Sequence, residues 1–239
     1  MKKRLIIIVV YLISLSSLPF FHSTGYAQEA EQVEAITKQI EARPNSAILY
    51  FLRGFQYAEA KQYHLAVNDY SKAIELQPQG SLFYICRAYS YSELKKYDMA
   101  MTDCNRAIDL DPKNAEYYSE RGYTEWKIGN FSRSIDDFTK AIELNPAAHF
   151  YDGRGNAYGC MGKYNEAIRD FEKAVQLNPK EGMAYFNLAQ AYDQLGDKER
   201  ALSNYQQASE IGVPNLSEAG QVKLEARLNG DWSNFKEWI

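Results

Sequence analysis

Polar and apolar residues alternate along this chain with the period of amphipathic α-helices, and the arrangement returns every 33 or 34 residues. The first copy predicts one helix over 47–60 and a second over 63–77, because apolar residues recur there at helical spacing. Pro78 then ends the second helix, since proline cannot continue the hydrogen-bond ladder. The apolar stripes of this copy contain Tyr50, Gly54, Tyr57, Ala66, Tyr70 and Ala73.

Five such copies follow one another, and prolines mark the period at Pro78, Pro112, Pro146 and Pro179. A fixed period of this length indicates an all-α array of antiparallel helix pairs, in which each unit buries its apolar face on its neighbours. We assign the units to residues 47–80, 81–114, 115–147, 148–181 and 182–214.

Charged residues recur in two columns of the array. Four first helices carry an arginine (Arg53, Arg87, Arg121 and Arg154), and four second helices carry an aspartate (Asp69, Asp103, Asp137 and Asp170). In the fifth copy both charges are lost together, as Leu188 and Asn204. Joint loss within one copy predicts that the arginine and aspartate of the same copy contact each other.

The first 27 residues differ from the rest of the chain. A basic start at 2–4 precedes a mostly apolar stretch at 5–21 and small residues at 25–27. This is the pattern of a secretory signal peptide cleaved after Ala27, and it predicts an extracytoplasmic protein, either periplasmic or secreted. The alternative is that 1–27 remains as a membrane anchor.

Charge narrows the choice of partners. The 27 Lys and Arg of the chain include three before residue 28, which leaves 24 against 31 Asp and Glu. This acidic balance predicts no nucleic-acid partner and no attraction to an anionic membrane surface, so that membrane contact would occur only through an uncleaved leader.

The repeated pattern Tyr-x-x-Arg/Leu-Gly/Ala-x-x-Tyr, followed by Ala, an aromatic residue, Ala and Pro, resembles the tetratricopeptide repeat over 47–214. The resemblance implies a right-handed α-solenoid, a superhelix whose first helices line a concave groove. It also implies a non-enzymatic scaffold or adaptor that binds a partner peptide or helix in that groove, with no cofactor.

The two ends of the array have the pattern of caps. Residues 28–46 contain a helical stretch that resembles the lone second helix of a degenerate unit, and 215–239 contain a further amphipathic helix and an aromatic tail. Repeat arrays need their terminal apolar faces covered, which favours capping. The alternative is that Trp232, Phe235 and Trp238 form a docking patch and make the protein a self-assembling homo-oligomer.

The expected groove changes in character along the array. Residues that the family resemblance places on its wall in the first three units are mostly apolar or aromatic: Ile48, Phe51, Phe55, Leu82, Ile85, Tyr89, Tyr123 and Trp126. In the last two units they are polar: His149, Asp152, Asn156, Asn187 and Gln190. An aromatic surface of this kind suits a peptide with apolar or proline anchors. The alternative is that the 28–43 helix folds into the groove and covers it.

A branch of the family grips carboxylate-ended tails with Lys, Asn and Arg. The matching positions here hold Phe51, Phe55, Cys86, Glu116 and Glu120, and two acids would repel a carboxylate. That specificity is therefore not expected for this chain.

No catalytic or metal-binding motif is expected. His149, Asp152, Asn156 and Cys160 follow one stripe of a helix, but metal ligands must converge from several directions, so a polar groove is the preferred interpretation. Cys86, Cys104 and Cys160 match no disulfide framework, although a bond between the first two is an alternative.

Overall fold

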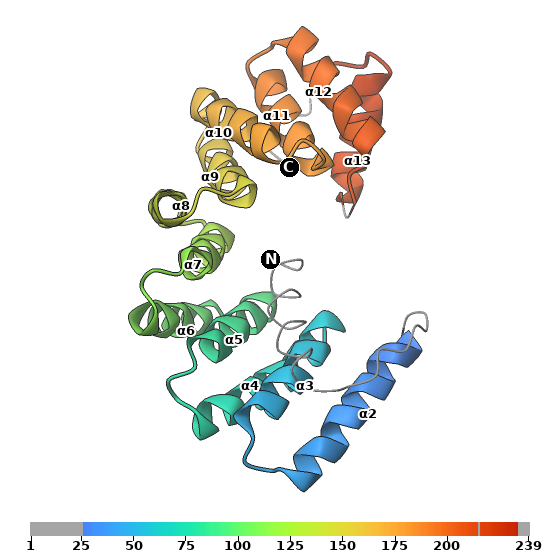
Figure 1. The fold of residues 1–239 in the computed structure, drawn as a ribbon. Helices are drawn as coiled ribbons and strands as arrows, with labels where there is room; N and C mark the ends of the chain where they lie inside the picture. Colours follow the sequence, from blue (N-terminus) through green and yellow to red (C-terminus); the bar gives the residue numbers. More distant parts are fainter. Residues whose placement is uncertain (1–25, 215, 234–239) are drawn as a thin grey trace. The chain divides into compact units, whose positions relative to one another are not determined.

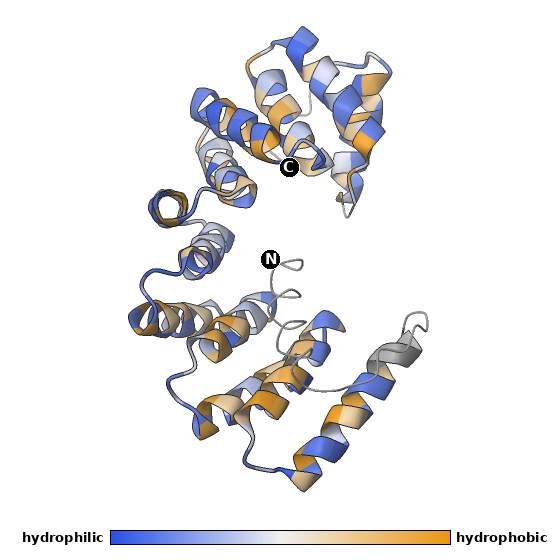
Figure 2. Cartoon of the chain, in the orientation of Figure 1, coloured by the Kyte–Doolittle hydropathy of each residue, from blue (hydrophilic) through white to orange (hydrophobic). Residues whose placement is uncertain are grey.

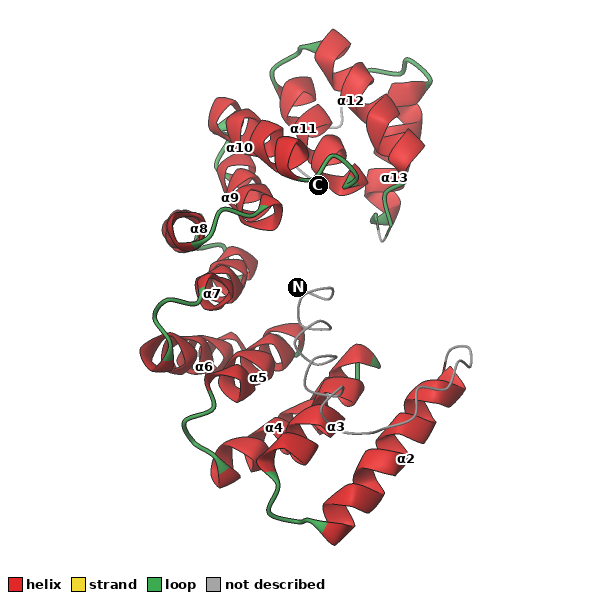
Figure 3. Ribbon diagram, in the orientation of Figure 1, coloured by secondary structure: helices red, strands yellow, loops and turns green. Residues whose placement is uncertain are grey.

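The computed structural model describes residues 26–214 and 216–233. Within these ranges the chain forms twelve helices and no strand (Figures 1 and 3). It divides into two compact units, up to Leu110 and from Asp111, which are described separately. The first contains α2(Tyr26–Ala42), α3(Ala47–Glu59), α4(Tyr63–Leu76), α5(Ser81–Glu93) and α6(Tyr97–Leu110). The second contains α7(Ala115–Lys127), α8(Phe131–Leu144), α9(Ala148–Cys160), α10(Tyr164–Leu177), α11(Gly182–Gln194), α12(Lys198–Ile211) and α13(Glu218–Leu228).

Consecutive helices pair as the sequence predicts. Each first helix packs along its own second helix (α3 on α4, α5 on α6, α7 on α8, α9 on α10, α11 on α12). Within each unit the second helix also packs on the next first helix. The predicted helices over 47–60 and 63–77 are confirmed as α3 and α4. Polar and apolar residues share each helix in Figure 2, as expected for helices that bury only part of their circumference.

Every hairpin turns in the same way. At each turn a residue with positive φ follows the first helix, and the next amide donates to a carbonyl five residues back, as in Lys96 N to Tyr91 O at 2.8 Å. This is the Schellman arrangement, for which glycine is the favoured residue at the positive-φ position. Gly129, Gly162 and Gly196 fill that position in the second unit, and Lys61 and Lys95 fill it in the first.

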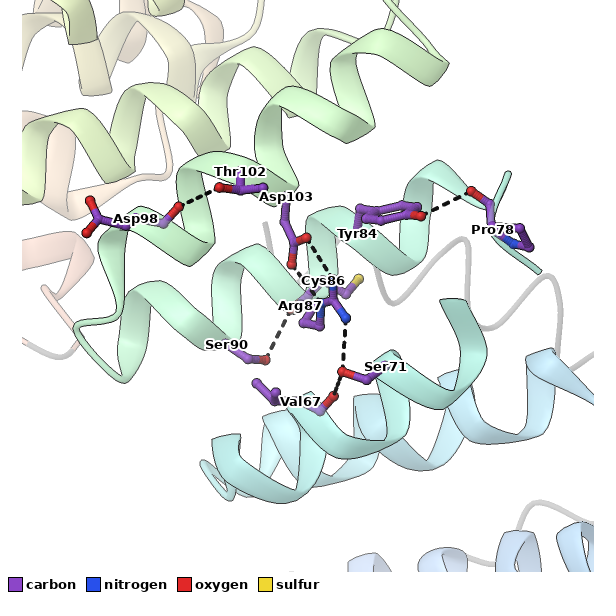
Figure 4. A network of polar contacts seen from close by, with 10 residues as sticks. All are labelled: Val67, Ser71, Pro78, Tyr84, Cys86, Arg87, Ser90, Asp98, Thr102 and Asp103. Atoms are coloured by element: carbon purple, nitrogen blue, oxygen red, sulfur yellow. Dashed lines mark hydrogen bonds and ion pairs between the residues drawn. The ribbon is translucent and has the colours of Figure 1, made fainter. Parts of the chain in front are cut away.

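The predicted pairing of arginine and aspartate within a copy is confirmed in all four copies. Figure 4 shows the pair formed by Arg87 and Asp103. Arg87 donates from Nε and from a terminal nitrogen to the two oxygens of Asp103, at 2.7 and 2.8 Å. Its other terminal nitrogen donates to Ser71 Oγ at 3.0 Å on the preceding second helix. Arg87 therefore ties its own hairpin to the previous one, as Arg154 also does through Thr139 at 3.0 Å.

The small residues allow helices of one hairpin to approach closely. A Cβ added to Gly54 would lie 2.9 Å from the ring of Tyr70, and one added to Gly155 would lie 2.7 Å from the ring of Phe171. Both aromatic rings are fully buried. A larger side chain at either glycine would separate the two helices.

The N-terminal helix α2 occupies the place of a second helix. Arg53 Nη1 donates to Thr37 Oγ1 at 3.1 Å, which reproduces the contact of Arg87 with Ser71. Ile36 and Ile40 are buried. Since α2 packs on α3 in this way, it covers the end of the hairpin stack instead of folding over the first helices.

The C-terminal helix α13 covers the fifth hairpin through polar contacts. Lys223 Nζ donates to Gln190 Oε1 at 3.2 Å, and Arg227 Nε donates to Asp193 Oδ2 at 2.8 Å. Trp232 lies over the guanidinium of Arg227, 5.2 Å from its ring centroid. This residue of the aromatic tail therefore packs on its own chain.

The predicted leader lies almost wholly outside the described residues, as do Phe235 and Trp238. Among the helices that are described, none combines the length and the apolar character needed to cross a membrane.

Candidate functional site

The first helices of successive hairpins are neighbours and form the candidate binding face. In the first unit α3 lies next to α5, and in the second unit α9 lies next to both α7 and α11. Side chains at one repeat position therefore form a short row across adjacent helices within each unit.

In the first unit the structure corrects part of the predicted surface. Ile48 is 38% exposed, and Leu82 and Tyr89 are half-buried. Phe51, Phe55 and Ile85 are instead buried, and Phe51 has no exposed surface.

The ring of Phe51 lies between two other rings, 5.9 Å from Tyr70 and 5.3 Å from Phe83. It therefore belongs to the hydrophobic core that joins α3, α4 and α5 and does not line a groove. The physical reason is that α3 packs against α2, α4 and α5, which buries more than one stripe of its surface.

In the second unit the aromatic residues of α7 divide into two environments. Tyr123 is half-buried, its hydroxyl donates to the His149 carbonyl at 3.3 Å, and burial raises its pKa well above the ordinary value. Trp126 is 37% exposed. Trp126 can therefore offer aromatic surface to a ligand, whereas Tyr123 chiefly links α7 to α9.

Three predicted residues meet across α9 and α11, although Asn187 is buried and therefore does not line the predicted surface. Asn187 Nδ2 donates to one oxygen of Asp152 at 2.9 Å, and Asn156 Nδ2 donates to the other at 3.1 Å. Removal from water raises the pKa of Asp152 to about 6, although these hydrogen bonds and nearby His149 act in the opposite direction. The hydrogen bonds from the two amides stabilise the ionised carboxylate of Asp152, whereas burial favours its protonated form.

This raised pKa predicts a pH effect on stability. An acid whose folded-state pKa is raised takes up a proton during folding between about pH 6 and pH 4, so acidification over that window should stabilise the folded state. Wild-type protein should gain about 2 kcal/mol relative to Asp152→Asn between pH 7 and pH 4. Parallel melting curves across that range give the difference directly, and a gap that does not change with pH would contradict the assignment.

Two functional contacts were not predicted from the sequence. His149 Nε2 lies 3.1 Å from Glu116 Oε2, and Gln190 contacts Lys223 on α13. Glu116 and His149 occupy the same position of consecutive copies, so the repeat register was the signal that could have paired them. Gln190 is fully buried beneath the cap, which removes it from the predicted polar surface.

Metal binding and a disulfide bond are the two chemical alternatives that the sequence leaves open. Among the residues that the structure describes, no three His, Cys, Asp or Glu side chains are placed to hold a metal ion. The three cysteines are free thiols, so the alternative bond between Cys86 and Cys104 is not formed. The arrangement instead offers amide, carboxylate and aromatic groups on adjoining helices, which is a surface for recognition.

Comparison of the sequence with models of protein families identifies the family. Models of the tetratricopeptide repeat match residues 47–79, 81–114, 115–147 and 146–212. The chain belongs to the tetratricopeptide repeat family. No curated protein sequence matches it. Tetratricopeptide repeats are typically non-enzymatic scaffolds for protein–protein interaction, and the matches include no catalytic family.

Solved tetratricopeptide repeat structures share the fold. The chain is similar to MamA, with 24% identity, a TM-score of 0.59, and 69% of this chain and 91% of that chain covered. YrrB, described as a TPR protein with an unusual peptide-binding site, is 22% identical with a TM-score of 0.58, covering 81% of this chain and 98% of that one. PilF of Pseudomonas aeruginosa is 18% identical with a TM-score of 0.68, covering 80% and 87%. These likenesses concern the fold alone.

Proposed function

We propose that this protein is an extracytoplasmic, non-enzymatic adaptor that holds a partner polypeptide against its first helices. In the second unit the binding face would be formed by His149, Asp152 and Asn156 on α9, bordered by Trp126 on α7. In the first unit, described by itself, Ile48, Leu82 and Tyr89 would form an apolar binding face. The extracytoplasmic location rests on the sequence of residues 1–27.

One observation carries the binding proposal. Asn156 on α9 and the buried Asn187 on α11 donate to the two oxygens of Asp152, which fixes this carboxylate and the half-buried amide of Asn156 on the first-helix face. An amide side chain both donates and accepts hydrogen bonds, as the backbone of an extended peptide does. The amide of Asn156 beside a carboxylate already fixed by hydrogen bonds suits backbone recognition, because little of this surface needs ordering upon binding.

The peptide-binding description of YrrB adds support by analogy, since that chain is matched along nearly its whole length. The acidic groups Glu116 and Asp152 favour a partner segment with neutral or basic side chains over an acidic one.

Site-specific photo-crosslinking in the native host tests this proposal. A photoreactive residue at Trp126 or Asn156 should yield adducts with the same partner protein, because both positions lie on the first-helix face. Matched controls at Lys140 on α8 and Arg169 on α10 are exposed but lie on second helices. Adducts from the control positions alone, or equal adducts from both sets, would contradict the proposal.

Self-assembly through the C-terminal end is the competing function. Trp232 packs on Arg227 and also lies 5.6 Å from Lys198 Nζ, which leaves it less available to a second copy. Light scattering of chains with and without residues 231–239 separates the two functions. We expect both chains to have the same oligomeric state, whereas a larger assembly formed only by the chain that has the tail would favour self-assembly.

A further inference from the structure

The C-terminal helix α13 occupies the place that the first helix of a sixth hairpin would take. It packs on α12, as α9 packs on α8 and α11 packs on α10 (Figure 1). Its side chains Lys223 and Arg227 contact α11 residues that lie 33 and 34 residues earlier, which is the repeat period. In the described part of the chain, which ends at Ser233, no second helix follows α13. The fifth hairpin therefore provides a site for one more helix, and α13 fills it.

One side chain makes α13 an unfavourable occupant of this site. Lys223 has no exposed surface, and its Nζ donates to the neutral amide oxygen of Gln190 at 3.2 Å. Among the described residues Lys223 forms no ion pair. Burial lowers the pKa of Lys223, although Asp193 acts at longer range in the opposite direction. A buried ammonium group without a counter-charge is unfavourable, so the packed position of α13 keeps a penalty that disappears when Lys223 returns to water.

The other contacts of α13 indicate what the site prefers. Arg227 Nε donates to Asp193 Oδ2 at 2.8 Å, and the side chain of Asp193 is 11% exposed. Leu216, Leu224 and Trp232 pack against the apolar cluster of α10, α11 and α12. The site therefore favours an amphipathic helix that carries one arginine beside its apolar face, with Asp193 as the complementary charge.

The connection between α12 and α13 makes the last helix a separate element. The helix α12 ends at Ile211, and α13 begins at Glu218. The segment between them contains Gly212, with φ of 88°, and Pro214, and neither residue continues a helix. The position of α13 is therefore decided by its own contacts with α11 and α12, and its release would unfold no other helix.

We propose that α11 and α12 form a binding site for an amphipathic helix of a partner protein, and that α13 occupies this site as an internal competitor. The partner helix would place an arginine against Asp193 and an apolar side chain where α13 has Lys223. This inference does not rest on the proposed function, because the face formed by α9 takes no part in it.

The buried lysine explains how a partner could displace a tethered helix. A tethered helix competes at an effective concentration of the order of millimolar, so a perfect fit of α13 would exclude most partners. The penalty at Lys223 weakens α13 alone, whereas a partner helix with an apolar residue there keeps every favourable contact. Binding of the partner would then depend on the fraction of chains in which α13 is released.

Labelled peptides of residues 216–233 test the proposal with the full chain as receptor. Three synthetic peptides are compared by fluorescence anisotropy: the unchanged sequence, one with Lys223→Met, and one with Lys223→Met and Arg227→Ala. The Lys223→Met peptide should bind at least about tenfold more tightly than the unchanged peptide, because it buries no charge. The added Arg227→Ala should remove that gain, because it leaves Asp193 without its partner.

The same substitution in the receptor should act in the opposite direction. A full chain with Lys223→Met holds α13 more firmly, so it should bind the Lys223→Met peptide at least about tenfold more weakly than wild type does. Glu225→Gln is the matched control, because Glu225 is exposed on the same helix. That receptor should bind the peptide as wild type does.

Opposite effects of one substitution distinguish competition from a general change in folding. Absence of binding by the Lys223→Met peptide, equal binding of the first two peptides, or unchanged binding by the Lys223→Met receptor would each overturn the proposal. Light scattering of the wild-type receptor without peptide provides a further test. A dimer that dissociates when the Lys223→Met peptide is added would assign the site to α13 of a second copy and would also overturn it.

Discussion

Replacing Arg87 with alanine should lower the free energy of unfolding by about 3–5 kcal/mol, because it leaves Asp103 as a buried charge without its partner. The side chain of Asp103 is only 5% exposed, and both of its oxygens accept from Arg87. The same change also removes the hydrogen bond to Ser71 that joins two hairpins. Chemical denaturation followed by circular dichroism measures the loss.

The fifth repeat provides the matched control. It carries Leu188 and Asn204 in place of the charged pair, so Arg87→Leu combined with Asp103→Asn reproduces a solution already present in the chain. This double variant should be less destabilised than Arg87→Ala, since no unpaired charge remains. Equal stability of the two variants would show that the aspartate charge is not the cause of the loss.

Replacing Phe51 with alanine should also cost about 3–5 kcal/mol, the usual loss when a buried phenylalanine is truncated. The ring has no exposed surface and contacts the rings of Tyr70 and Phe83, which belong to the same hairpin and to the next. The loss should appear as a lower denaturant midpoint for the first unit.

Ile48→Ala is the control for this prediction, because Ile48 lies in the first turn of the same helix but is 38% exposed. It should change stability by no more than about 0.5 kcal/mol, as surface substitutions usually do. If Phe51→Ala were as stable as Ile48→Ala, the result would indicate that Phe51 lies on the ligand-binding surface and not in the core.

The hairpins could be predicted from the sequence because their causes are local. Helical spacing of apolar residues gave the extent of α3 and α4, and Pro78 marked where the second helix stops. The contact between Arg87 and Asp103 was also predictable, because the fifth copy lost both partners at once. The five copies thus served as an alignment, because equivalent positions could be compared between one copy and the next.

The division between core and surface could not be predicted in the same way. A stripe of residues shows one buried face, whereas α3 packs on both α4 and α5 and buries a wider part of its surface. Phe51 shares its repeat position with Asp152, so the column mixes apolar and polar residues and gives no consistent sign of burial. The contact of Asp152 on α9 with Asn187 on α11 depends on geometry that no local pattern contains.

The central claim is that first helices bind and second helices support them. Hydrogen–deuterium exchange with the crosslinked partner segment, added as a synthetic peptide, tests it most directly. We expect slower exchange in α9 and α11 of the second unit and little change in α8 and α10. Slower exchange confined to the second helices, or no change in any first helix at saturating peptide, would contradict the account.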